Sequence, residues 1–158
     1  MQVGAYCLMP NHFHLLLQEK ATVGITTFMH KVATAYTMYF NIKRDRVGGL
    51  FLKPFRSRHV AEEYYFRHVA QYIHLNPVEL FEPGWKEGRV KHYEDVENQL
   101  KRYTYSSLPD YESEKRPQSS VIAPEAFNLI SEGLPPLVNV LADAAEYYKT
   151  LENIKASP

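Results

Sequence analysis

MPNHFHLLLQ, residues Met9–Gln18, is the stretch that decides the fold. Its proline and asparagine are typical of a turn, and the apolar run Leu15–Leu17 is typical of a strand that is buried on both faces. Because successive side chains of a strand point to opposite faces, His12 and His14 share one face and Phe13 lies on the other. Two histidines so placed can bind a metal ion. On this pattern alone they can also be structural residues, so a metal site needs support from elsewhere in the chain.

The segments on either side of this stretch predict a hairpin packed by helices. Val3–Met9 is rich in β-forming residues and lies close enough to pair with a second strand at Phe13–Gln18. Between Ile25 and Lys43 the apolar residues recur every three or four positions. This spacing predicts an amphipathic helix that covers one face of the sheet. Ala61–Leu75 has the same spacing. We expect this second helix to end just before Pro77, since proline disfavours helical geometry in the preceding residue.

The remaining segments give weaker patterns. Leu50–Val60 alternates loosely, which suggests a further strand. Val96–Tyr103 suggests a short helix, and Tyr105–Pro124, with several serines and prolines, reads as a loop. Leu137–Ile154 carries an apolar stripe at helical spacing. We expect it to pack on the core, and a helix that binds a partner is the alternative.

Composition restricts the class of protein. The chain has 158 residues, about one domain, and an ordinary hydrophobic fraction of 45%. Cys7 is the only cysteine, which excludes an internal disulfide and a multi-cysteine zinc site and favours a reducing, cytoplasmic setting. No apolar stretch approaches the roughly 20 residues of a membrane span, so we expect no membrane partner.

The charge is divided unevenly, although the formal net charge is zero. Residues 1–60 carry eight Lys and Arg against two acids, whereas residues 61–158 carry ten against sixteen. A basic first half of this kind can bind a phosphate backbone, because neutralising phosphates releases counterions. An ordinary solvated surface is the alternative.

Support for the histidine pair comes from YIHLNP, Tyr72–Pro77. Positions four apart share one face of a helix, so Tyr72 and Asn76 project together. Two imidazoles and an amide oxygen leave room for water and phosphate oxygens on Mg²⁺ or Mn²⁺. A cation there would help the weakly nucleophilic phenol of Tyr72 to attack a phosphate. The alternative is that Tyr72 is a core aromatic residue of an amphipathic helix.

Three segments in this order resemble one family of enzymes. AYCLMPNHFHLLLQ (5–18), GGLFLKPFRSRHV (48–60) and YIHLNPVEL (72–80) together look like the single-tyrosine HUH transposases, in the branch of REP-associated tyrosine transposases. YSSLPDY (105–111) is similar to a serine-rich motif that often follows in that branch.

The resemblance implies an α/β (α+β) fold: a ferredoxin-like antiparallel sheet with helices on one face, followed by a C-terminal helical extension. We therefore divide the chain into a catalytic core, residues 1–80, and an extension, residues 81–158, packed on it. Family members normally carry a further strand and helix before the histidine motif. We expect this chain to lack both that first strand and the helix, and the missing strand is central in the usual order of the sheet.

The resemblance also assigns roles to residues. Tyr72 matches the catalytic tyrosine, which attacks a phosphodiester of single-stranded DNA and leaves a 5′-phosphotyrosine link and a free 3′-hydroxyl. The matching ligands of a divalent metal, Mg²⁺ or Mn²⁺, are His12, His14 and Asn76. We assign contacts with the DNA backbone to Lys53, Arg56 and Arg58.

The expected activity is nicking and rejoining of structured single-stranded DNA, with a short REP-like hairpin as substrate and a homodimer as one arrangement of the enzyme. Two alternatives stay open. One is a catalytically inactive remnant that only binds DNA hairpins, and the other is a metal phosphoesterase of small substrates. Only the first reading predicts a covalent adduct with DNA.

Overall fold

The structure is a computed structural model. It describes residues 1–52, 54–61, 63–87, 89–112, 116–131 and 135–144. A two-stranded antiparallel hairpin lies at its centre, formed by β1 (Gln2–Leu8) and β2 (Phe13–Gln18). The turn is closed by the Met9 N–H, which donates to the His12 carbonyl over 2.8 Å. The predicted hairpin is therefore confirmed, with β1 displaced by one residue.

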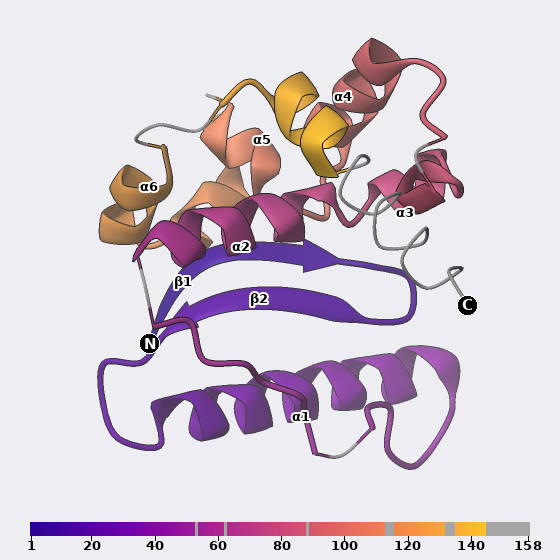
Figure 1. The fold of residues 1–158 in the computed structure, drawn as a ribbon. Helices are drawn as coiled ribbons and strands as arrows, with labels where there is room; N and C mark the ends of the chain where they lie inside the picture. The colour runs from indigo at the N-terminus through magenta and orange to yellow at the C-terminus, as the bar shows by residue number, and fades with distance from the viewer. Residues whose placement is uncertain (53, 62, 88, 113–115, 132–134, 145–158) are drawn as a thin grey trace, which may run out of the picture.

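Two long helices lie on opposite sides of the hairpin, α1 (Gly24–Arg44) and α2 (Glu63–Leu75) (Figure 1). Both agree with the helices that the apolar spacing predicts. The α1 helix ends with Lys43 and Arg44, whose charges suit the negative end of the helix dipole. The mixed α/β class is confirmed, with α1 on the side of the hairpin that faces away from α2 and the extension.

The part of the chain after α2 is mostly helical. Its elements are α3 (Val78–Phe81), the 3₁₀ helix η1 (Trp85–Glu87), α4 (Tyr93–Arg102), α5 (Leu108–Tyr111), the 3₁₀ helix η2 (Pro117–Val121) and α6 (Pro124–Ser131). Residues 137–144 are also helical, and the rest of the expected final helix lies outside the described residues. The segment that we expected to be a loop thus contains α5 and η2. None of the described helices is long and apolar enough to cross a membrane.

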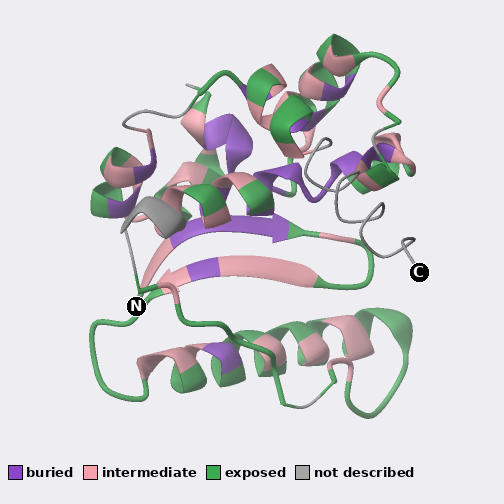
Figure 2. Cartoon of the chain, viewed as in Figure 1, coloured by how far each residue is buried: buried purple, intermediate pink, exposed green. Residues whose placement is uncertain are grey.

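Two apolar clusters form the core. The first joins the hairpin to α2 and α6, and its buried members are Ala5, Cys7, Leu16, Ala70, Ile73 and Ile130. The second joins Leu75, at the end of α2, and Val78 to Trp85 and Leu100 of the extension. By contrast, α1 buries only Met29, and most of its surface is exposed (Figure 2). Helix α2, which carries Tyr72, is therefore supported by a packed core. Helix α1 has no comparable buried contact beyond Met29.

The extension covers the outer edge of β1. Backbone N–H groups of Ser107 and Ala123 donate to the carbonyls of Tyr6 and Val3, both over 2.9 Å, and the Leu8 N–H donates to Tyr105 over 2.8 Å. These bonds satisfy backbone groups that an edge strand would leave unpaired. These contacts show that the two parts pack together, but they do not show where one part ends. The boundary that we place near residue 80 therefore stays a prediction.

The prediction of a strand at Leu50–Val60 was wrong. The described residues of this segment, 50–52 and 54–60, contain no strand, and the sheet of the described chain has two strands only. A strand needs a neighbouring edge to pair with, and the described residues of this segment pair with neither β1 nor β2. The segment instead runs past α1 towards the start of α2 (Figure 1).

Candidate functional site

The two histidines lie together at the turn end of β2. Their ring centroids are 5.0 Å apart, and the ring planes are nearly perpendicular. His12 immediately precedes the strand and is exposed, whereas His14 pairs with Cys7 of β1 and is half-buried. The alternation of a strand therefore places both imidazoles on one face, as the sequence predicts.

The ring nitrogens of this pair are suited to a metal. His12 Nδ1 lies 2.6 Å from Asn11 Oδ1, and if it donates there, Nε2 keeps its lone pair. His14 Nε2 is buried, and it has no hydrogen-bond partner among the described residues. Burial, helped by the nearby charges of His12 and Lys86, lowers the pKa of His14 below its ordinary value. A neutral imidazole with an unused nitrogen is what a divalent cation requires.

Helix α2 brings Tyr72 over the histidines. The Tyr72 and His14 ring centroids are 6.2 Å apart in an edge-to-face arrangement, and the tyrosine is 44% exposed. The helix is oriented by Ala70 and Ile73, which are buried against the hairpin. Tyr72 is therefore not the core aromatic residue of the alternative reading. Its hydroxyl is carried on a side chain that solvent and substrate can reach.

Asn76 lies just after the end of α2. Its amide Nδ2 donates to the carbonyl of Tyr72 over 2.8 Å and to that of Ile73 over 3.3 Å. These bonds satisfy carbonyls that the helix end would leave unpaired, and they leave Oδ1 as the atom for a ligand. The described residues contain no group of three or more His, Cys, Asp or Glu that could hold a metal, so a cation here would depend on this amide and on water.

The basic residues assigned to DNA are placed less specifically. Arg56 and Arg58 are exposed in the segment before α2, and neither forms an ion pair or hydrogen bond with another described residue. Lys53 lies outside the described residues. The structure thus brings His12, His14 and Tyr72 together through ring contacts, and it leaves the three cations as a prediction.

A buried polar network beside the site escaped sequence reasoning. His74 Nε2 lies 2.8 Å from Ser107 Oγ, which also accepts a hydrogen bond from the Tyr6 N–H over 2.9 Å. Burial lowers the pKa of His74 to about 3, so the imidazole is neutral. This network ties α2 to β1 and to the serine-rich motif. One signal in the sequence could have indicated this network. His74 is two positions after Tyr72, and residues two apart on a helix point to nearly opposite faces, so an exposed Tyr72 implies a buried His74.

Asp110 and Arg116 form the second part of this network. The guanidinium binds the carboxylate through two nitrogens, over 3.0 and 2.6 Å, and it also donates to the carbonyls of Thr104 and Ser106. Both side chains are largely buried. Hydrogen bonding to Asp110 raises the pKa of Arg116 above its ordinary value. The pair therefore holds the serine-rich segment against β1.

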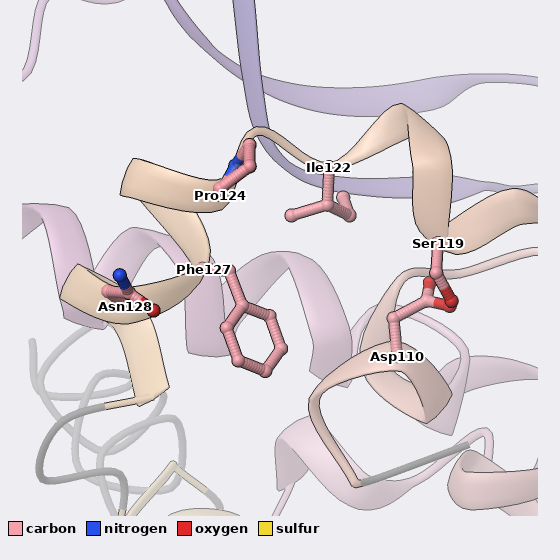
Figure 3. A pocket seen from close by; sticks show the side chains of 6 residues that line it. All are labelled: Asp110, Ser119, Ile122, Pro124, Phe127 and Asn128. Carbon is pink, nitrogen blue, oxygen red and sulfur yellow. The ribbon is translucent and has the colours of Figure 1, made fainter. Parts of the chain in front are cut away.

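A surface pocket lies between α5, η2 and α6 (Figure 3). Its lining residues are Asp110, Ser119, Ile122, Pro124, Phe127 and Asn128. The Asp110 carboxylate in it is already bound by Arg116 and by the Ser119 hydroxyl, at 2.6 Å. None of its lining residues belongs to the histidine and tyrosine site.

Comparison with known families gives one match, over the first half of the chain. Residues 1–76 match the family model "Transposase IS200 like". The match includes the histidine pair, Tyr72 and Asn76, and it supports a place for the chain in the transposase family. No curated protein and no solved structure matches the chain. The likeness to IS200-like transposases therefore stands on the first 76 residues, and it suggests a DNA-cleaving enzyme.

Proposed function

We propose that the chain is a metal-dependent transposase of the single-tyrosine HUH type, which nicks and rejoins structured single-stranded DNA. The observation that carries the proposal is the contact between the exposed Tyr72 ring and His14, beside the His12–His14 pair. The family match supports the transposase class. The tyrosine mechanism, the metal and the REP-like hairpin are the finer parts of this proposal, as is a cytoplasmic location.

Tyr72 acts as the nucleophile. Its phenolic oxygen forms a bond to the phosphorus of a phosphodiester and gives its proton to solvent, while the bond from phosphorus to the 3′ oxygen breaks. The 3′ oxygen takes up a proton and leaves as a hydroxyl, and the 5′ phosphate stays on the tyrosine. The reverse attack by another 3′-hydroxyl releases the tyrosine, so strands are rejoined without an external source of energy.

His12, His14 and Asn76 are the residues that would hold Mg²⁺ or Mn²⁺. The buried Nε2 of His14, which has no hydrogen-bond partner among the described residues, fits such an ion. The bonds of Asn76 Nδ2 leave its Oδ1 as the remaining donor atom of that side chain. A bound cation supplies charge that stabilises the phenolate and polarises the phosphate. The low pKa of His14 keeps its imidazole neutral and available for coordination. Burial of Ile73 fixes the helix so that Tyr72 stays at this position.

The test is the covalent product. The chain is incubated with end-labelled DNA hairpins that carry single-stranded flanks, in the presence of Mn²⁺, and the product is read on a denaturing gel. We expect a protein–DNA adduct that disappears in Tyr72→Phe and with a chelator, and that persists in Tyr105→Phe. Tyr105 is the matched control because it is also exposed, at 62%.

The outcomes separate the alternatives. An adduct that persists in Tyr72→Phe would contradict the assignment of the nucleophile. Hairpin binding without any adduct in the parent chain would favour the inactive DNA-binding remnant. No affinity for DNA at low salt would favour a phosphoesterase of small substrates.

A further inference from the structure

Five aromatic side chains form a continuous line of ring contacts from β2 to α1. We call them the aromatic array, and its members are Phe13, Phe51, Tyr36, Tyr39 and Phe40. The rings of Phe13 and Phe51 are 5.6 Å apart, and Phe51 lies 5.9 Å from Tyr36. Tyr36 in turn lies 6.3 Å from Tyr39 and 6.2 Å from Phe40. The array begins on the strand that follows His12 and ends on the exposed helix.

The outer part of the array is open to solvent. Tyr36 is 48% exposed and Tyr39 is 55% exposed, although rings that only fill a core would be covered. Ile42 on the same helix is 80% exposed. Contiguous exposed apolar surface of this kind marks a site of interaction.

Two cations lie beside the rings on α1. The Lys43 ammonium lies 5.4 Å from the centre of the Tyr39 ring and 3.0 Å from its hydroxyl oxygen, and the Arg46 guanidinium lies 5.9 Å from the Phe40 ring. From residue 20 to residue 61 the sequence carries eight Lys and Arg and a single acid, Asp45. The charge of this face therefore favours an anionic partner. A second copy of the chain would bring the same positive charge to it.

We propose that the aromatic array binds unpaired nucleotides of a single-stranded nucleic acid, with bases stacked on Tyr36 and Tyr39 and phosphates near Lys43 and Arg46. Exposed rings beside a row of cations are the combination that holds single strands, because every base has a flat face and every linkage has a charge. In a duplex the bases are already stacked on one another, so the rings have no equivalent surface to bind.

The position of the aromatic array relative to the metal site indicates which part of the DNA substrate it binds. Phe13 lies between the two histidines but on the opposite face of β2, so the array starts one residue from the proposed metal site. A strand that passes round the turn end of the hairpin can place bases on the array and a phosphodiester at Tyr72. This step rests on the proposed function. It assigns the array to the unpaired DNA that flanks the hairpin.

Binding of a fluorescent oligo(dT) of about 15 nucleotides to the full chain, at low and rising salt, tests the proposal. Fluorescence anisotropy is compared for the parent, Tyr39→Leu and the matched control Ile42→Ala. Leucine keeps an apolar side chain but removes the ring, and Ile42→Ala removes exposed apolar surface without touching a ring. We expect Tyr39→Leu to weaken binding about fivefold or more, and Ile42→Ala to leave it unchanged.

Two results would overturn this inference. One is oligonucleotide binding by Tyr39→Leu that equals that of the parent. The other is an equal loss in Ile42→Ala, because a lipid surface or a second copy would use the apolar area rather than the ring. The anisotropy measurement needs no covalent adduct, so failure of the covalent reaction and failure of the array are seen separately.

Discussion

His74 lies two residues after Tyr72 on α2, and the two side chains have opposite environments. Tyr72 is exposed beside His14, whereas His74 is 2% exposed and bonded to Ser107. One helix turn therefore carries the proposed nucleophile on its outer face and a structural side chain on its inner face. The pKa of about 3 at His74 makes that inner contact sensitive to acid.

We expect stability to fall as the pH falls below about 6.5, the ordinary pKa of histidine. The folded chain keeps His74 neutral down to about pH 3, whereas the unfolded chain takes up a proton near 6.5, so acid favours the unfolded state. Between about pH 6.5 and about pH 5 this group alone removes about 2 kcal/mol of unfolding free energy.

Urea unfolding at about pH 7.5 and about pH 5 measures this loss. His74→Gln should be less stable than the parent at the higher pH and should lose less stability on acidification. His30→Gln, an exposed change on α1, should behave as the parent does. Equal acid sensitivity in the parent and His74→Gln would contradict the assignment. The lowered pKa of His14 also makes the folded chain less stable in acid, so it accounts for part of the acid sensitivity that remains in His74→Gln.

At the scale of elements, α2 carries the site because its other face is packed. Ala70 and Ile73 are buried at 0% and 4% exposure against the hairpin, and this packing directs Tyr72 towards His14. Helix α1 has no such anchor beyond Met29. The position of Tyr72 beside His14 therefore depends on the contact between α2 and the sheet.

Ile73→Ala tests that dependence. Loss of a buried isoleucine side chain is expected to cost about 2–5 kcal/mol of unfolding free energy, because it leaves a cavity under the helix. Leu80→Ala, at a residue that is 43% exposed, should change the value by about 0.5 kcal/mol or less. Urea unfolding gives both numbers. Similar values for the two variants would show that α2 is not anchored through Ile73.

Elements with their own periodicity could be predicted from the sequence. The apolar spacing of α1 and α2 and the alternation around His12 and His14 are local signals, so the helices, the hairpin and the shared face of the histidines agree with the structure. Leu50–Val60 failed because a strand is defined by its partner, which lies elsewhere in the chain. The bond between His74 and Ser107 spans 33 positions and leaves no local pattern.

At the scale of the whole molecule, the Asp110–Arg116 pair joins the extension to the hairpin. The side chains are 2% and 11% exposed, and the arginine also binds the carbonyl of Ser106, the bridge partner of Cys7. A buried pair stabilises little by itself. Removal of one partner, however, leaves a charge without compensation.

Asp110→Asn should therefore cost about 3–5 kcal/mol of unfolding free energy. Glu97→Gln, in the more exposed pair with Lys101, should cost about 1 kcal/mol or less. Chemical denaturation measures both changes. Susceptibility to limited proteolysis near the serine-rich motif should rise only in Asp110→Asn. A small and equal effect of the two changes would contradict the role given to the buried pair.

The hydrogen bonds that cover the outer edge of β1 also set the order in which the chain can fold. Tyr6 and Ser107 are 101 positions apart, and Val3 receives its bond from Ala123. The hairpin and its helices are local and can form early, but β1 gains the neighbours of its outer edge only after residues 105–123 have been made. Contacts over such separations slow folding. Coverage of the outer edge of β1 is thus a late step, which follows synthesis of the segment that covers it.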